Sequence, residues 1–438
     1  MKFLFCLVLT LFLINSVTSL YCYWNTGCPY KYFSSKTPYN AIRGDIRDSV
    51  VKLTDCKPVS IWALVRHGKR NPGGANADSM KEAIKIRDYV VSSYVNGNSS
   101  LCAQDIENLR DMTVDYKMFE QPHQLSAEGH QEMLGIGKRL RQAFPNLLAE
   151  LDQQNYIFRP AFGNWMENSG KSFIKGLGNN NLVLEKAKPD YDIMAPYATC
   201  GKYQRDVKTN PEIFEEARKY QESSEYLAAK DRIQRRLGID NDLTNDNITA
   251  LYDLCRFSWS GFSNNISPWC ALFTTGDLQV MEYIGDIKHY YKNGYGTPMN
   301  ELLGQIPMAD LLTKFQEAKD GNGKKIVTYF THATMLDMVY TALKLFKDDK
   351  PLVGSPRNQD RKWRSSKFST FAANLIVALN RCNNNGNEEY NVVFYLNEEP
   401  LIPICKEGVC TWQEFEDKLK PFLNTNTEFC EFKSVPYK

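Results

Sequence analysis

Two short apolar runs, each leading into a histidine, restrict the folds open to this chain. Residues 60–65 have the pattern of a buried central strand, and His67 lies two positions after its end. Residues 325–330 have the same strand character and lead into His332. Ligand sites in α/β sheets lie at the carboxyl ends of strands. We therefore expect both histidines at the edge of a sheet, beside a pocket.

The order of the remaining segments predicts an α/β domain built from both ends of the chain, with a mainly helical domain inserted. Further strands are expected at about residues 374–379 and 391–396, whereas residues 165–320 are mostly helical in pattern. We expect a signal peptide at 1–19, the first part of the α/β domain at 20–164, the mainly helical insert at 165–324 and the second part of the α/β domain at 325–438.

Three helices are bounded by their caps and periodicity. Ser126 is a candidate N-cap for a helix that runs to about residue 140. A long charged helix is expected from Asn210-Pro211 to about residue 237, because proline is tolerated in a first turn. A third helix, about residues 277–291, carries apolar side chains at three-residue spacing, which is typical of packing against a core.

The N-terminus has the pattern of a secretory signal. Lys2 precedes an apolar run over residues 3–14, and Val17 and Ser19 have cleavage-compatible spacing. That run is shorter than the roughly 20 residues needed to span a bilayer, and no later stretch is long and apolar enough. The C-terminal tail is neither a retrieval signal nor a lipid-anchor signal. We expect a secreted protein without a membrane span; its final destination, extracellular or lysosomal, stays open.

Cysteine usage agrees with export. Twelve cysteines occur, and removal of Cys6 with the signal leaves eleven, which we expect to be mostly disulfide-bonded with one thiol left over. The sequence does not fix the pairing, but it offers these candidates: Cys255 with Cys270, Cys405 with Cys410, and also Cys56 and Cys382. Glycosylation acceptor motifs begin at Asn98, Asn247 and Asn265. Without CxxC pairs or a histidine cluster, we expect no metal site.

Overall charge gives no reason to expect a nucleic-acid or membrane-surface partner. The chain has 53 basic and 51 acidic residues and a formal net charge of +2. An anionic ligand must therefore be held by a local basic cluster.

The five histidines divide into two groups. Three of them, His123, His130 and His289, stand among polar neighbours near or on helices and are expected to be solvated or hydrogen-bonded. The pair His67 and His332 is expected to be functional, because both follow buried strands. That arrangement suits phosphoryl transfer, in which an imidazole attacks phosphorus to form a phosphohistidine.

The residues around His67 supply further parts of that chemistry. Arg66 and Arg70 bracket the nucleophile and provide forked donors for phosphate oxygens. A cationic His332 would add charge stabilisation across the site. The remaining requirement is a general acid for the leaving group, a role that typically contributes 10²–10⁴-fold.

These residues carry a family resemblance. The heptapeptide Arg66-His67-Gly68-Lys69-Arg70-Asn71-Pro72 resembles the RHGxRxP signature of the histidine acid phosphatases. The pair His332-Ala333 is similar to the inositol polyphosphate phosphatase branch, where other branches have His-Asp. The resemblance covers roughly residues 50–430. It implies a histidine-phosphatase-like α/β fold, no cofactor, and a small anionic substrate such as an inositol polyphosphate.

The resemblance also implies roles for single residues, with two departures. His67 corresponds to the nucleophile, Arg66 and Arg70 to phosphate clamps, and His332 to the second histidine. The third phosphate-binding arginine of the family falls on Trp165, and the acid of its His-Ala-Glu motif falls on Thr334. Loss of the arginine removes an interaction worth roughly 1.5–3 kcal/mol. Asp337, three residues past Thr334 on the same predicted helical face, is a candidate substitute acid.

Two functions follow, and the sequence leaves both open. The first is a phosphomonoesterase that acts on inositol polyphosphates through a phosphohistidine, with reduced activity. The second is a secreted, catalytically impaired pseudophosphatase that keeps the loop and binds phosphorylated ligands. A mutase or transferase of the wider histidine phosphatase group fits poorly with a signal peptide and many cysteines.

Overall fold

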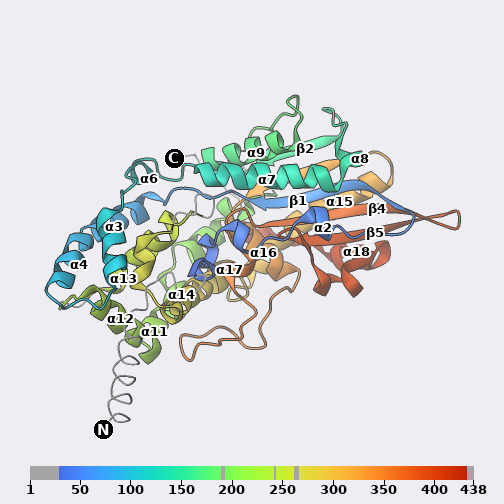
Figure 1. The fold of residues 1–438 in the computed structure, drawn as a ribbon. Coiled ribbons are helices and arrows are strands. Elements are labelled where there is room, and N and C mark those ends of the chain that lie inside the picture. Colours follow the sequence, from blue (N-terminus) through green and yellow to red (C-terminus); the bar gives the residue numbers. More distant parts are fainter. Residues whose placement is uncertain (1–28, 189–192, 241–242, 261–265, 432–438) are drawn as a thin grey trace, which may run out of the picture.

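The computed structural model describes residues 29–188, 193–240, 243–260 and 266–431, and Figure 1 shows their arrangement. The predicted signal peptide, the acceptor Asn265, and Cys6, Cys22 and Cys28 lie outside these residues.

A single mixed sheet organises the molecule, which confirms the α/β class. Its strands run in the order β2-β3-β1-β4-β5-β6, and β7 pairs with β5. The three strands on the β2 side are parallel, whereas β4 runs antiparallel to β1. The strands are β1 (Cys56–Arg66), β2 (Tyr156–Pro160), β3 (Ile326–Thr331), β4 (Asn374–Asn384), β5 (Asn387–Leu396), β6 (Glu399–Pro400) and β7 (Val409–Thr411).

The register of β1 and β3 brings the two predicted site histidines together. Arg66 pairs with Thr331 in the parallel ladder, so each histidine is the first residue after its strand. The backbone N–H of His67 donates to the carbonyl of Thr331 at 3.0 Å. Both imidazoles therefore leave the sheet at the carboxyl ends of neighbouring strands, as the sequence predicts.

Side chains of β1 alternate between two cores, one on each face of the sheet. On one face, Ile61 and Val65 belong to a cluster with Ile136 of α7 (Ala127–Ala143) and Phe173 of α9 (Asn164–Leu177). On the other face, Trp62 belongs to a cluster with residues of α15 (Met299–Lys319) and α16 (Ala333–Ala342). Figure 1 shows α7 and α9 lying along the upper face of the sheet.

A second group of helices lies beside the sheet, at the left in Figure 1. It includes α14 (Thr275–Asn293), α13 (Asn245–Ser258), α12 (Ser224–Leu237), α11 (Glu215–Gln221), α3 (Gly74–Ile84), α4 (Ile86–Val95) and α5 (Ala103–Asp111). The described residues between 165 and 324 contain helices and no strand. Helices from the first part of the chain join this group, since α3 packs on α13.

The predicted helix boundaries fare unequally. Ser126 caps α7, because its side chain accepts from the Gly129 N–H, and a capping box at Thr274 starts α14 two residues before the predicted position. The continuous helix predicted from residue 211 to 237 is wrong. It is divided into a 3₁₀ turn (Pro211–Phe214), α11 and α12, because the Ser223 side chain caps a new helix.

Disulfides connect distant parts of the fold. Cys56 pairs with Cys382 across β1 and β4, and Cys200 pairs with Cys430. The sequence-adjacent pairs Cys255–Cys270 and Cys405–Cys410 are also formed. With Cys102, all nine cysteines that the structure describes are disulfide-bonded. These bonds are typical of proteins from oxidising compartments.

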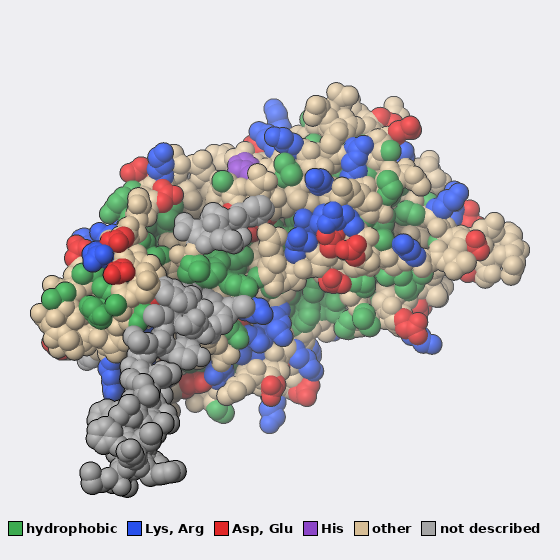
Figure 2. All heavy atoms as spheres, in the orientation of Figure 1, with side chains coloured by type: hydrophobic (Ala, Val, Ile, Leu, Met, Phe, Trp, Pro, Cys, Tyr) green, Lys and Arg blue, Asp and Glu red, His purple; other side chains and the backbone are tan. Residues whose placement is uncertain are grey.

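The surface carries both signs of charge. Figure 2 shows Lys and Arg side chains interspersed with Asp and Glu over the face displayed, in line with the small net charge. No helix among the described residues is long and apolar enough to cross a bilayer.

Candidate active site

The loop after β1 is held against the first turns of α7. The backbone N–H of Lys69 donates to Glu132 Oε2 at 2.8 Å, and the Lys69 ammonium contacts Glu128 Oε2 at 2.6 Å. Gly68 packs so closely on α7 that an added Cβ would lie 2.4 Å from the Gly129 carbonyl oxygen. Glycine is therefore required at this position.

His67 is fixed in the tautomer that a nucleophile needs. Its Nδ1 lies 2.8 Å from the carbonyl oxygen of Gly68. A carbonyl only accepts, so Nδ1 carries the proton and Nε2 keeps its lone pair. Burial lowers the pKa of His67 well below its usual value, and Arg66, Arg70 and His332 lower it further. The ring is therefore neutral, the form that attacks phosphorus.

The two arginines keep free donors near this ring. Arg66 Nη1 donates to the carbonyl oxygens of Ser35 at 2.6 Å and Ser369 at 2.7 Å. Neither Nε of Arg66 nor Nε of Arg70 has a hydrogen-bond partner in the part of the chain that the structure describes. Burial lowers the pKa of Arg66 to about 9 and that of Arg70 to about 10. Both stay charged in neutral and acidic solution, so their unpaired donors suit an anion.

His332 is the N-cap residue of α16 and faces His67. The two ring centroids are 5.7 Å apart in an edge-on arrangement. Burial lowers the pKa of His332 to about 3, with contributions from Arg70 and Arg66. Desolvation and two neighbouring guanidinium groups thus oppose a third positive charge, against the sequence-based expectation of a cationic His332.

The two substituted positions face the same space. The Trp165 ring stacks on His123 at 4.8 Å between centroids, and the Arg70 guanidinium lies 5.9 Å from the Trp165 ring. Trp165 also lies 6.1 Å from His332. Thr334, in the first turn of α16, lines the adjoining cavity with a hydroxyl group. An aromatic ring and a hydroxyl thus occupy the positions where the resemblance implies an arginine and an acid.

A cavity of about 1150 Å³ opens beside these residues. The volume is slightly above the roughly 300–1,000 Å³ that is typical of small-molecule sites. No Asp or Glu is among the described residues that line it, whereas six lysine and arginine side chains are. These cations are Lys36, Arg70, Lys208, Arg256, Lys288 and Lys292.

The lysines of the cavity lie close to other cations. Burial lowers the pKa of Lys36, Lys288 and Lys292, and nearby cations lower it further: Arg256 acts on the first two and Lys208 on the third. None of these four lysines pairs with a carboxylate within the described ranges. The cavity is therefore an electrostatic site for an anion with several charges.

Asp337 does not face the cavity. It is fully buried, and its Oδ2 lies 2.6 Å from His289 Nδ1 and 3.0 Å from the Asn293 amide nitrogen. The Ser369 hydroxyl donates to its Oδ1. The residue that lines the cavity at this point is His289.

Sequence reasoning missed several residues that the fold gathers here. His123 was expected to be solvated or hydrogen-bonded, but it stacks on Trp165, and His289 lines the cavity wall. A signal existed on α14, where Gly285, Lys288 and Lys292 recur at helical spacing and mark one polar strip. Of the three histidines set aside, His130 has a ring that hydrogen-bonds Ser172.

The remaining site predictions have simple outcomes. Asn98 is exposed, whereas the Asn247 side chain takes part in the capping box of α13. Within the described residues, no group of three His, Cys, Asp or Glu side chains is arranged to hold a metal ion.

Comparisons with known proteins agree on one family. A sequence profile described as histidine phosphatase superfamily (branch 2) matches residues 60–397. Multiple inositol polyphosphate phosphatase 1 of Drosophila melanogaster is 28% identical over 413 residues, which cover 90% of this chain and 86% of that protein. The Homo sapiens protein of the same name is 25% identical over 439 residues, covering 91% of this chain and 88% of that protein.

Solved structures show the same fold. The phytase from D. castellii matches with a TM-score of 0.74 at 18% identity, covering 93% of this chain and 88% of that chain. The Bifidobacterium longum multiple inositol polyphosphate phosphatase in complex with inositol hexasulfate matches with a TM-score of 0.67 at 14% identity, covering 91% and 99%. At these identities the likeness establishes the fold.

Proposed function

Because the chain belongs to the histidine phosphatase superfamily (branch 2), we propose that it hydrolyses phosphate monoesters of inositol polyphosphates through a phosphohistidine on His67. Its curated relatives include phosphatases named for inositol polyphosphates. The parent chemistry needs only protein side chains, so the proposal includes no cofactor.

The cationic cavity is the observation that carries this proposal. Four lysines without carboxylate partners within the described residues, together with Arg70, surround a space of about 1150 Å³. A single phosphate group needs far fewer cations than this. A compact ring that carries several phosphates matches both the volume and the surplus of positive charge.

The residues present suggest a division of roles. His67 Nε2 attacks phosphorus, while the unpaired donors of Arg66 and Arg70 stabilise the charge on the transferring group. The ring of neutral His332, whose centroid is 5.7 Å from that of His67, is placed to donate a hydrogen bond to a phosphate oxygen. Water then attacks the phosphohistidine and releases phosphate.

A second function, binding of phosphorylated ligands without turnover, is favoured by the replaced positions. Trp165 packs against His123 and Arg70, and His67 is only 2% exposed. A threonine hydroxyl holds its proton too tightly to protonate a leaving group. In this alternative the cavity retains its affinity for polyanions but hydrolysis is impaired.

We further propose that the protein is secreted and glycosylated. The disulfide bonding of all nine described cysteines supports an oxidising compartment, extracellular or lumenal. The exposed Asn98 is the preferred acceptor, because the Asn247 side chain is engaged in a helix cap.

Phosphate release from inositol hexakisphosphate and from an aryl phosphate tests the two functions. We expect release by the wild-type protein and none by His67→Ala. The double variant Trp165→Arg with Thr334→Glu should release phosphate faster than wild type. Activity only in the double variant would favour the binding function, and wild-type release that survives in His67→Ala would contradict the phosphohistidine mechanism.

A further inference from the structure

The position where the family resemblance implies an acid carries no acidic group, but His289 lies nearby. Thr334 offers only a hydroxyl to the cavity, and Asp337 is enclosed. His289 projects from α14 with a side chain that is 17% exposed and lines the cavity. Its Nδ1 lies 2.6 Å from Asp337 Oδ2, and its Nε2 lies 3.1 Å from Ser35 Oγ.

A closed ring of hydrogen bonds connects His289 to the loop that carries the nucleophile. Arg66 Nη1 donates to the backbone carbonyls of both Ser35 and Ser369. The Ser369 hydroxyl donates to Asp337, Asp337 binds His289, and His289 contacts the Ser35 side chain. Ser35 thus links the imidazole of His289 to Arg66, the residue that precedes His67.

The proton positions in this ring can be assigned. Asp337 receives hydrogen bonds from the Ser369 hydroxyl and the Asn293 amide, so it acts as an ionised acceptor. With His289 Nδ1 donating to this carboxylate, Nε2 is the ring nitrogen on the side of Ser35. A buried carboxylate behind an imidazole fixes the orientation of the ring.

The other histidines near the cavity are poorly suited to carry a proton. The pKa of His332 is lowered to about 3, and that of His123 is also lowered, in both cases by burial and by Arg70. His289 differs because a carboxylate, Asp337, lies directly behind it.

We propose that His289 is the general acid of this site and that Asp337 is its positioning residue, so that together they replace the carboxylic acid missing at position 334. The inference rests on the proposed phosphatase function. It assigns the acid role to the residue that Asp337 holds, instead of to Asp337 itself.

The reaction is balanced with these groups. As the bond between His67 Nε2 and phosphorus forms, the bond from phosphorus to the leaving oxygen breaks, and that oxygen takes the proton from His289 Nε2. The products are a neutral alcohol, a phosphohistidine and a neutral His289. In the second step His289 Nε2 takes a proton from the attacking water while the bond between His67 and phosphorus breaks, which restores the starting state.

Leaving-group dependence tests the inference in the full-length protein. Inositol hexakisphosphate needs an acid because it releases an alkoxide, whereas 4-nitrophenyl phosphate releases a stable phenolate. We expect His289→Asn to lower kcat/KM for inositol hexakisphosphate by about 10²–10⁴-fold and for the nitrophenyl ester by less than about 10-fold. Adding Thr334→Glu to His289→Asn should restore most of the lost activity.

Two control variants test whether the loss in His289→Asn is specific and not caused by a damaged fold. His130→Asn changes a histidine that bonds Ser172 away from the cavity, and we expect it to match wild type on both substrates. His289→Asn with Asp337→Asn removes the buried charge that the single variant leaves unpaired. We expect the double variant to keep wild-type thermal stability, a stoichiometric burst of nitrophenolate and the same selective loss as His289→Asn.

The outcomes separate the two proposals. Equal losses on both substrates, no loss on either, or no restoration by Thr334→Glu would overturn the role of His289 while leaving the phosphatase function standing. A wild-type protein that releases phosphate from neither ester would overturn both.

Discussion

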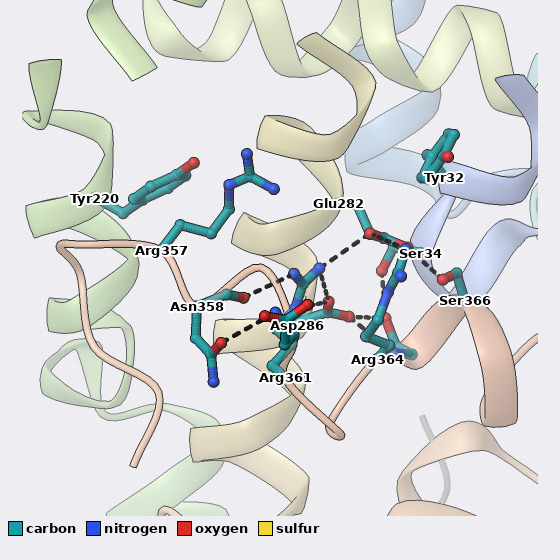
Figure 3. A network of polar contacts seen from close by, with 12 residues as sticks. Tyr32, Ser34, Tyr220, Glu282, Asp286, Arg357, Asn358, Arg361, Arg364 and Ser366 are labelled. Carbon is teal, nitrogen blue, oxygen red and sulfur yellow. Dashed lines mark hydrogen bonds and ion pairs between the residues drawn. The ribbon is translucent and has the colours of Figure 1, made fainter. Parts of the chain in front are cut away.

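Helix α14 carries charged side chains on two neighbouring strips, and the two strips balance charge in different ways. On the first, the buried carboxylates of Glu282 and Asp286 pair with Arg361 at 2.9 and 2.6 Å. Figure 3 shows this network, in which Arg364 and Ser366 also bind Glu282. On the second, Lys288 and Lys292 face the cavity and have no carboxylate partner within the described residues.

This difference separates structural charge from functional charge. Buried ions persist when a partner and hydrogen bonds satisfy them, as around Arg361, which is 4% exposed. Cations that face a cavity without partners instead oppose one another, and the pKa of Lys288 and Lys292 is lowered accordingly, first by burial and then by neighbouring cations. A fold retains such an arrangement where an anion completes it.

Removing Arg361 should have the largest effect on stability. Arg361→Met leaves Asp286 buried without its arginine partner and takes from Glu282 one of the two arginines that bind it, and we expect the free energy of unfolding to fall by about 3–5 kcal/mol. Urea denaturation measures this loss. A double variant that adds Asp286→Asn should recover part of it, because the unpaired carboxylate is removed while Glu282 keeps its pair with Arg364. A loss below about 1 kcal/mol in Arg361→Met would show that the paired strip does not stabilise the fold.

An anion bound in the cavity should stabilise the protein through the unpaired lysines of the second strip. Inositol hexasulfate, which is not a phosphate ester, should raise the free energy of unfolding by about 2.7 kcal/mol at 100 times its dissociation constant. Lys288→Met with Lys292→Met should weaken this effect without destabilising the empty protein, because it removes mutually repelling charges. Thermal unfolding with and without the ligand measures the stability of the ligand-free protein and the stabilisation that the ligand adds.

Lys350→Met is the control for that experiment, because Lys350 is exposed on a loop outside the cavity. We expect it to unfold like wild type in both conditions. If Lys350→Met weakened the ligand effect as much as the cavity variant, the anion would be responding to overall charge and not to the unpaired strip.

The positive charges around His332 should make the stability of the protein depend on pH. Its pKa is lowered to about 3 in the folded protein, against about 6.5 in an unfolded chain. Below pH 6.5 the unfolded state therefore binds a proton that the folded state does not. The free energy of unfolding should fall as the pH decreases, by at most about 1.4 kcal/mol per pH unit from this residue.

His332→Asn should flatten that dependence between about pH 6.5 and 3, as measured by urea denaturation at a series of pH values. His130→Asn, a histidine away from the cavity, is the comparison variant. A wild-type pH dependence that is unchanged in His332→Asn would mean that the cationic surroundings do not depress the protonation of this ring.

The sequence predicted the sheet edge better than the cavity. Short buried runs identify β1 and β3, and their register then brings His67 and His332 together without further information. The position of α14 depends on contacts between segments far apart in the chain, such as Arg361 with Asp286. No local pattern encodes those contacts, so the cavity lysines and the role of His289 were not foreseen.

Asp337 illustrates the limit of helical spacing. Asp337 lies three positions after Thr334 on α16, but Thr334 lines the cavity and Asp337 is covered by α14. Spacing predicts which side chains share a face of a helix. It does not predict which neighbouring element covers that face, and this decides whether a carboxylate meets substrate or a histidine.

The smallest effect should come from pairs that are matched but exposed. Arg235 and Asp231 form an i, i+4 pair on α12 at 2.7 Å, with side chains 76% and 53% exposed. We expect Arg235→Met to change the free energy of unfolding by less than about 0.5 kcal/mol, because water screens the pair. Urea denaturation beside Arg361→Met compares the two directly. A similar loss of unfolding free energy in Arg235→Met and Arg361→Met would mean that pairing alone, without burial, explains the stability of the matched strip on α14. The two strips of α14 would then differ only in their response to the ligand.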